Sequence, residues 1–281
     1  MNEARRFGSL NLLIDFPPFF RPFFPNRQVS SFPFHSLALR TMEASTTLAA
    51  VASVARRMHE GHDAAHDFAH VERVRRLAAS LAGEDENLLP RADAWLAEVA
   101  ALLHDIKDYK QGYADGDTEI EARSILKEVG VEAQATEDIL YAISECGFKK
   151  SLPHSDGRPP AHARPPSERA SALRDILNDA DLLDAIGAIG VARCFAFGGK
   201  RDRLLYNPDG PDNDGDGEAL TQEAYAQRSQ GQSYSLDHFG EKLFKLKALM
   251  RTKAGAARAT QRHDFMVAFV QQFKAEREGR A

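Results

Sequence analysis

Apolar residues recur at intervals of three and four along most of this chain, and that spacing restricts it to helical architectures. One stripe runs through residues 46–58 at Leu48, Val51, Ala52 and Ala55. A second runs through residues 71–81 at Val71, Val74, Leu77, Ala78 and Leu81. Both place apolar side chains on one face of an α-helix. Because no stretch shows the sustained two-residue alternation of a strand, the sequence predicts an all-α fold.

Further helices are expected on the same grounds. They cover residues 92–104, 119–129, 136–144, 169–184, 185–197, 236–250 and 256–276. The last has a predicted apolar face formed by Phe265, Phe269 and Phe273. Residues 151–169, rich in proline, and residues 203–218, rich in Asp and Gly, are predicted loop insertions because their composition breaks helices. We expect residues 43–279 to form a single domain that contains both insertions.

The first 42 residues differ from the rest of the chain. Residues 1–41 contain five arginines, two acidic residues and eight of the chain's 17 phenylalanines. Their prolines rule out a regular helix around residues 17–25. An arginine-bearing, acid-poor leader that contains serine is typical of an organelle transit segment. A disordered extension of a cytoplasmic protein fits the same composition, and we expect this, with organelle targeting as the alternative.

The overall composition narrows the classes of partner. The net charge is −5, so long nucleic acid and acidic membrane surfaces, which attract strongly basic proteins, are not expected to bind. No apolar run approaches the roughly 18 residues that a membrane span needs. Two cysteines cannot form a disulfide framework. The oligomeric state stays open.

Two histidines and two aspartates in helical segments form a candidate set of metal ligands. His70 lies in the second apolar stripe, and Asp181 lies in the helix predicted at residues 169–184. His104 and Asp105 end the apolar helix before the first loop. Mixed nitrogen and oxygen ligands suit Mn²⁺, Fe²⁺, Co²⁺ or Mg²⁺ better than a zinc site built from thiolates. The sequence therefore predicts one divalent metal ion, without deciding among the four.

The sequence motifs around these residues resemble those of the HD-domain metal-dependent phosphohydrolase superfamily. The likeness is to a compact subgroup that carries HDxxHxxRV, ALLHDI, DADxLDAIGAIGxAR and HFxxKLxKL. This chain reads HDFAHVERV from His66, AALLHDIKD from Ala100, NDADLLDAIGAIGVAR from Asn178 and DHFGEKLFKLKALM from Asp237. Its last helix, RHDFMVAFVQQF from Arg262, is also similar. The likeness covers residues 45–278 and implies a compact helical fold with a metal at its centre.

Residue roles follow from this resemblance. It implies that the metal ligands are His70, His104, Asp105 and Asp181. His66 precedes His70 by four residues, so both can face the same way on one helix. His66 is expected to bind substrate or to support the metal site rather than to be a ligand.

The chemistry expected at such a site is phosphoryl transfer. A divalent ion can hold a phosphate oxygen and turn water into the nucleophile that attacks phosphorus in line. Lys107 and Asp108, which follow the His-Asp pair, are candidate catalytic residues for phosphate contact and proton removal. Arg73, Arg193 and Lys242 are candidate substrate-binding cations. The expected partner is a small phosphorylated metabolite, with a nucleotide favoured.

Two other functions are compatible with the same fold. One is a non-catalytic regulator that binds metal or nucleotide. The other is a di-iron oxygenase, which needs additional histidines between the His-Asp pair and the last ligand. His154 and His162 are the only candidates, and they lie in the proline-rich loop, although metal ligands normally need rigid supports. At residues 144–149 the chain reads SECGFK where bacterial relatives tend to read a His-Ser-Phe word, so their substrate contacts cannot be transferred.

Residues 212–223, DNDGDGEALTQE, match the calcium-loop pattern D-x-D-x-D-G-x₅-E. An EF-hand needs a helix that leads into this loop. Pro208, Gly210 and Pro211 prevent such a helix. A solvated acidic loop is therefore predicted, with a surface calcium site as the alternative.

Overall fold

The computed structural model describes residues 34–60, 68–107, 114, 116–153, 155–156, 163–210, 221–223 and 234–280. Within these ranges the chain forms helices joined by turns and loops, and no strand is present. The predicted all-α class is confirmed.

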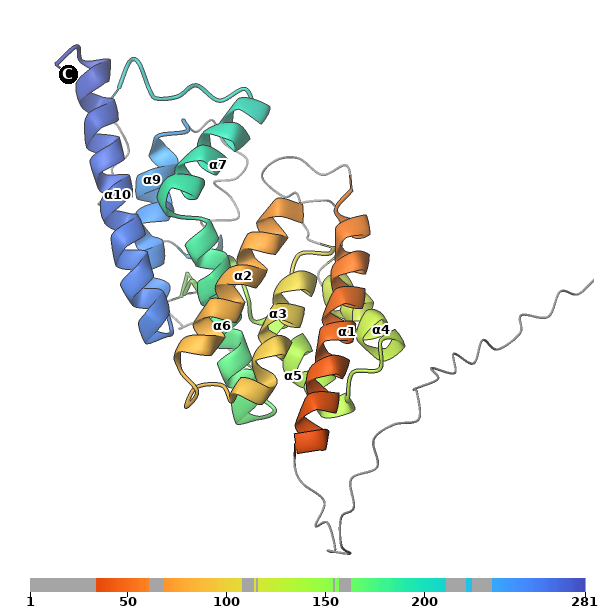
Figure 1. Ribbon diagram of the computed structural model, residues 1–281. Helices are drawn as coiled ribbons and strands as arrows, with labels where there is room; N and C mark the ends of the chain where they lie inside the picture. Colours follow the sequence, from red (N-terminus) through yellow and green to blue (C-terminus); the bar gives the residue numbers. More distant parts are fainter. Residues whose placement is uncertain are drawn as a thin grey trace, which may run out of the picture.

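The helices of the first two thirds of the chain form one packed group (Figure 1). They are α1 (Phe34–Met58), α2 (Phe68–Glu84), α3 (Ala94–Leu103), α4 (Asp117–Glu128), α5 (Ala133–Ser144) and α6 (Glu168–Asp184). Two 3₁₀ turns, η1 (Arg91–Asp93) and η3 (Lys149–Ser151), belong to the same region. α2 packs against α3 and α6, α5 packs against α6, and α1 packs against α3.

The remaining helices pack beside this group. They are α7 (Gly187–Lys200), α9 (Asp237–Glu241), the 3₁₀ helix η4 (Leu243–Leu249) and α10 (Lys253–Arg277). α10 contacts α7, η4 and α6 and leads to the C-terminus (Figure 1). The far end of the sequence is therefore packed against the helix that carries the predicted ligand Asp181.

Two of the helices that carry or precede the candidate ligands, α3 and α6, are largely buried. Seven of the ten residues of α3 are buried, and so are 11 of the 17 residues of α6. α3 is apolar on nearly all faces, as expected of a helix in a core. Polar residues at the end of α3 and within α6 are consequently held on rigid, tightly packed supports.

The turn between α6 and α7 depends on two glycines. Gly187, the first residue of α7, has a φ of 76°, which glycine adopts without strain. A Cβ atom at Gly190 would overlap the backbone carbonyl oxygen of Ala185. Together they allow the chain to bend by 65° between the two helices.

Three predicted segments differ from the structure. α1 begins at Phe34, before the expected domain boundary at residue 43, because no proline follows residue 33 to break the helix. The helix predicted at residues 236–250 is the short α9 followed by η4, and its apolar residues mix spacings of three and four, of which the spacing of three within residues 243–249 suits a 3₁₀ helix. Phe265 is 49% exposed, whereas Phe269 and Phe273 pack against the core.

Among the described helices, none is by itself long and apolar enough to cross a membrane. The bent pair of α6 and α7 meets those criteria only when the two helices are taken together.

Asp179 ties α6 to the start of α10. Its buried carboxylate accepts hydrogen bonds from the backbone N–H groups of Arg251 and Thr252, at 2.9 and 2.8 Å, and from the Thr252 hydroxyl at 2.8 Å. The Thr252 hydroxyl in turn accepts a hydrogen bond from the N–H of Gly255. Burial raises the pKa of Asp179, so desolvation offsets part of this stabilisation.

Replacement of Asp179 by alanine is expected to lower the free energy of unfolding by about 2 kcal/mol, because the buried N–H of Thr252 and the part-buried N–H of Arg251 lose their acceptor. Urea unfolding followed by circular dichroism measures this difference. Glu168→Ala, a change at the exposed start of the same helix, is the control. An unchanged urea midpoint for Asp179→Ala would contradict the proposed anchor.

Candidate metal centre

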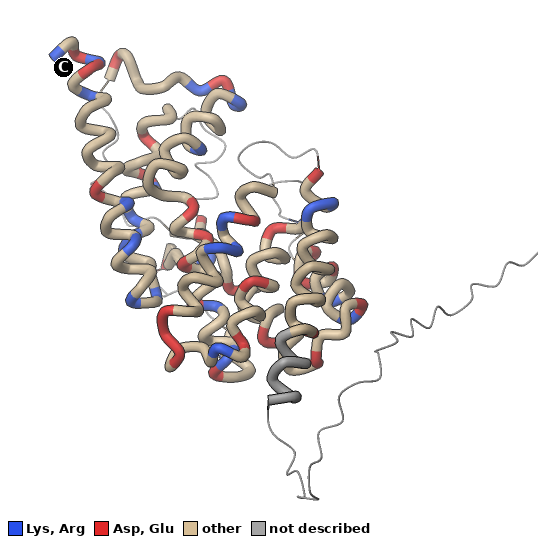
Figure 2. The backbone as a smooth tube through the Cα atoms, in the orientation of Figure 1, with Lys and Arg blue, Asp and Glu red and all other residues tan. Residues whose placement is uncertain are grey.

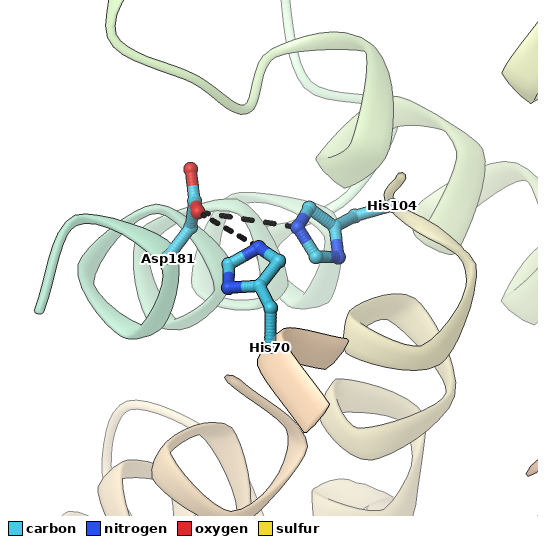
Figure 3. A group of neighbouring side chains, drawn as sticks. All are labelled: His70, His104 and Asp181. Atoms are coloured by element: carbon cyan, nitrogen blue, oxygen red, sulfur yellow. Dashed lines mark ion pairs between the residues drawn. The ribbon is translucent and has the colours of Figure 1, made fainter. Parts of the chain in front are cut away.

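The four predicted ligands come together where three helices meet. His70 is buried on α2, His104 and Asp105 directly follow α3, and Asp181 lies on α6. The Nε2 atom of His70 lies 3.7 Å from Asp181 Oδ1 and 3.8 Å from Asp105 Oδ2. The Nε2 atom of His104 lies 3.9 Å from both of these oxygens. Figure 3 shows both imidazole rings pointing toward Asp181.

Both histidines are oriented by a hydrogen bond at the far side of the ring. Nδ1 of His70 lies 2.7 Å from Asp184 Oδ2, and Nδ1 of His104 lies 2.8 Å from the carbonyl oxygen of Ala101. Because a carbonyl or carboxylate oxygen can only accept, each Nδ1 must donate its proton. The unprotonated Nε2 atoms then face the aspartates, as metal ligation requires.

The side chains fit a divalent ion. His70, His104 and Asp181 each offer a ligand atom within 4.8 Å of the other two. Atoms that each lie about 2.1 Å from one ion are at most about 4.2 Å apart, so the 3.7–3.9 Å separations suit an ion placed between them. The Nε2 atom of His104 is buried and has no hydrogen-bond partner within the described part of the chain. A bound cation would satisfy it.

Asp184 accepts hydrogen bonds from three side chains, two of them arginines. It is 2% exposed and accepts hydrogen bonds from His70, from Arg73 and from Arg193. Burial opposes its ionisation, but the hydrogen bonds from His70 and Arg73, together with the charge of Arg193, hold its pKa well below the usual range. Burial also lowers the pKa of His70, which keeps that imidazole neutral.

A cavity of about 440 Å³ opens onto these side chains. His70, His104, Asp105 and Asp181 form part of its wall. Its lining also includes five cationic residues, Lys107, Lys149, Lys150, Arg193 and Lys242. The arrangement can therefore hold a cation at one place and an anionic ligand beside it.

Four of the five cations of the cavity wall are restrained by neighbours, and one of them, Lys150, donates to the backbone carbonyl oxygen of Ser144. Lys107 donates to Glu121 at 2.9 Å, and Arg193 donates to Asp184 at 2.7 Å. The ammonium group of Lys242 lies 5.0 Å from the centre of the Phe148 ring, within the range of a cation–π contact. These contacts hold the charges at the wall of the cavity without removing them from it.

Of the other predicted site residues, one does not belong to the cavity wall and the rest lie outside the described part of the chain. Arg73 does not line the cavity; both its Nε and Nη2 donate to Asp184, which favours a structural role over the predicted contact with substrate. His66 and Asp108 lie outside the described residues, as do His154 and His162. Most of the calcium-like segment, residues 211–220, also lies outside them. The roles predicted for these residues stay predictions.

Sequence reasoning missed Asp184 and Phe148. Asp184 follows Asp181 by three residues within the same family-like word, so its position near the ligand was already visible in the sequence. Phe148 lies in the segment that departs from the bacterial His-Ser-Phe word. Its contact with Lys242 joins residues 94 positions apart, which no local pattern reveals.

A helical fold in which histidines and aspartates converge from three helices fits the HD-domain class of proteins. The family model of the HD domain matches residues 67–186, and the chain belongs to the HD-domain family. Its relatives include YpgQ of Bacillus subtilis (strain 168), to which it is 32% identical over 214 residues, 76% of this chain and 85% of YpgQ.

Solved structures of relatives share the fold. A protein from Lactobacillus plantarum is 32% identical, with a TM-score of 0.63 over 83% of this chain and 98% of the other. An HD-superfamily hydrolase from Bacillus thuringiensis is 30% identical, with a TM-score of 0.58 over 85% and 98%. The crystal structure of Bacillus subtilis YpgQ in complex with ADP has a TM-score of 0.56 and 27% identity, over 84% and 97%.

Proposed function

We propose that this protein is a metal-dependent phosphohydrolase that cleaves a phosphoester or phosphoanhydride of a small metabolite, with a nucleotide as the favoured substrate. The observation that carries this proposal is the common orientation of His70 and His104. Each Nδ1 is committed to an acceptor, and each Nε2 faces the oxygens of Asp105 and Asp181 at the wall of a cavity.

The proposed ligands are His70, His104, Asp105 and Asp181. A divalent ion bound there would supply positive charge to a phosphoryl oxygen and lower the pKa of a coordinated water. Arg193 and Lys242, both in the cavity wall, would neutralise the remaining phosphate charge. Lys107 is held by Glu121 beside the His-Asp pair and would contact phosphate from that side. Asp108 remains the candidate base.

A nucleotide is favoured by the charge and the lining of the cavity. Five cationic residues suit a ligand with more than one negative group, and the apolar side chains of Ile143, Phe148 and Leu182 suit a base or a sugar. The relative YpgQ was crystallised with ADP, which supports the same ligand class. Acidic and basic residues are interspersed along the backbone (Figure 2), a pattern that favours a small ligand over a long nucleic acid.

The decisive test is release of phosphate and of pyrophosphate from nucleoside mono-, di- and triphosphates with Mn²⁺, Fe²⁺, Co²⁺ or Mg²⁺. We expect metal-dependent release that falls more than about 100-fold in Asp105→Ala, since even residues that only support metal ligands contribute 10- to 100-fold. Tight binding of one metal ion without release from any nucleotide would contradict the nucleotidase proposal. It would instead favour a regulator or a different phosphoester.

A further inference from the structure

We propose that Asp184 is the positioning residue of this centre: it fixes the tautomer and the orientation of His70, so that Nε2 of that ring is available to a metal ion. The inference rests on the proposed metal site and extends it by one residue. Asp184 itself neither lines the cavity nor belongs to the candidate ligand group.

The geometry around Asp184 fixes the proton of its hydrogen bond with His70 on the imidazole. Its Oδ2 accepts from Nδ1 of His70 at 2.7 Å, from Nη2 of Arg73 at 3.0 Å and from Nη1 of Arg193 at 2.7 Å. Its Oδ1 accepts from Nε of Arg73 at 2.6 Å. A carboxylate placed between two guanidinium groups has no proton to give. His70 must therefore donate from Nδ1, and a neutral imidazole that donates from Nδ1 has its lone pair on Nε2.

The two arginines also fix where the carboxylate lies. Arg73 comes from α2, one turn after His70, and Arg193 comes from α7. Asp184 is the last residue of α6, three positions after Asp181. The contact therefore fixes the position of His70 on α2 relative to Asp181 on α6. One ion can bind both side chains only if both are held in place.

Arg193 gives the same contact a second effect. It lines the cavity while its Nη1 donates to Asp184, so the carboxylate also sets the position of a charge that faces the substrate. Asp184 accordingly supports the metal side and the phosphate side of the centre at once.

The first test compares Mn²⁺ affinity of the wild type and of Asp184→Asn, measured by the electron paramagnetic resonance signal of free Mn²⁺. The amide introduced by this change can donate to Nδ1, which permits the tautomer with a proton on Nε2. We expect affinity to fall 10- to 100-fold, the usual effect of removing a residue that supports a metal ligand.

Asp138→Asn is a matched control for the loss of a buried aspartate. Asp138 is 0% exposed and accepts a 2.6 Å hydrogen bond from Arg169 and a 2.8 Å hydrogen bond from Ser167. It does not line the cavity. We expect its variant to lose stability as Asp184→Asn does, but to bind Mn²⁺ within about threefold of the wild type, because no metal ligand depends on it.

The second test reads the tautomer directly. In wild-type protein without metal, ¹⁵N nuclear magnetic resonance of the histidine side chains should show the proton of His70 on Nδ1, with the resonance assigned through His70→Gln. In Asp184→Asn, the proton should shift partly or wholly to Nε2. A wild-type His70 protonated on Nε2 would overturn the inference even if the variant failed to fold. Unchanged Mn²⁺ affinity in a folded Asp184→Asn would overturn it as well.

These readouts are independent of catalysis. If no nucleotide is hydrolysed but Asp184→Asn weakens Mn²⁺ binding, the positioning role stands and the proposed function fails. If nucleotides are hydrolysed and the variant binds Mn²⁺ like the wild type, the function stands and the positioning role fails.

Discussion

Replacement of Asp181 by alanine is expected to weaken divalent metal binding more than about 100-fold, which exceeds the effect of losing a supporting residue. Asp181 Oδ1 lies within 3.9 Å of Nε2 of both His70 and His104, as does Oδ2 of Asp105. Without Asp181 the two imidazoles keep only the carboxylate of Asp105, and a site that has lost one of its two charged ligands holds a small divalent cation poorly.

Thermal unfolding with and without Mn²⁺ checks this prediction. A ligand present at 100 times its dissociation constant stabilises the folded state by about 2.7 kcal/mol, which corresponds to roughly 5–11 °C in a domain of this size. We expect this shift in the wild type and no shift in Asp181→Ala. Asp175→Ala is the control, because Asp175 lies on the same helix with a similarly exposed side chain, 19% against 25%. A full Mn²⁺ shift in Asp181→Ala would exclude Asp181 as a ligand.

Gly190→Ala is expected to lower the free energy of unfolding by about 3 kcal/mol, at the upper end of the usual cost of overpacking. The added Cβ overlaps the backbone carbonyl oxygen of Ala185, and a backbone atom cannot move aside as a flexible side chain can. The strain falls on the turn between α6 and α7, which brings Arg193 onto Asp184.

Urea and thermal unfolding measure this effect, with an expected decrease in the melting temperature of roughly 6–12 °C. Gly199→Ala is a matched control on the same helix. A Cβ at Gly199 meets no atom within 4 Å, so alanine should leave stability unchanged or raise it slightly through its higher helix propensity. Equal stability of the two variants would show that the α6–α7 turn tolerates the added methyl group.

The helices themselves could be predicted from the sequence because their signal is local. The apolar stripe at residues 71–81 lies within α2, and the glycines near residue 187 mark the break between α6 and α7. The exceptions also have local causes. Around residues 236–250, spacings of three and four residues are mixed, and the structure places a 3₁₀ helix where an α-helix was predicted.

The metal centre was predictable in part. Its four candidate ligands could be named from sequence motifs that occur in a fixed order, and the structure brings His70, His104 and Asp181 within reach of one ion. The partners of Arg73 and Arg193 could not be predicted. Whether an arginine faces substrate or an internal carboxylate depends on how α2, α6 and α7 pack, and that packing is set by contacts far apart in the sequence.

The C-terminal helix has a consequence for the order in which the centre is assembled. Asp179, two residues before Asp181, is held by backbone groups 72 and 73 positions later, and Arg262 on α10 donates to the carbonyl oxygen of Leu183. During synthesis, α6 leaves the ribosome well before these groups exist. A nascent chain that ends before Arg251 therefore has all four candidate ligands but lacks the contacts that hold one of their helices. The candidate ligand helix α6 is thus held by its full set of contacts only once the chain through Arg262 has been made.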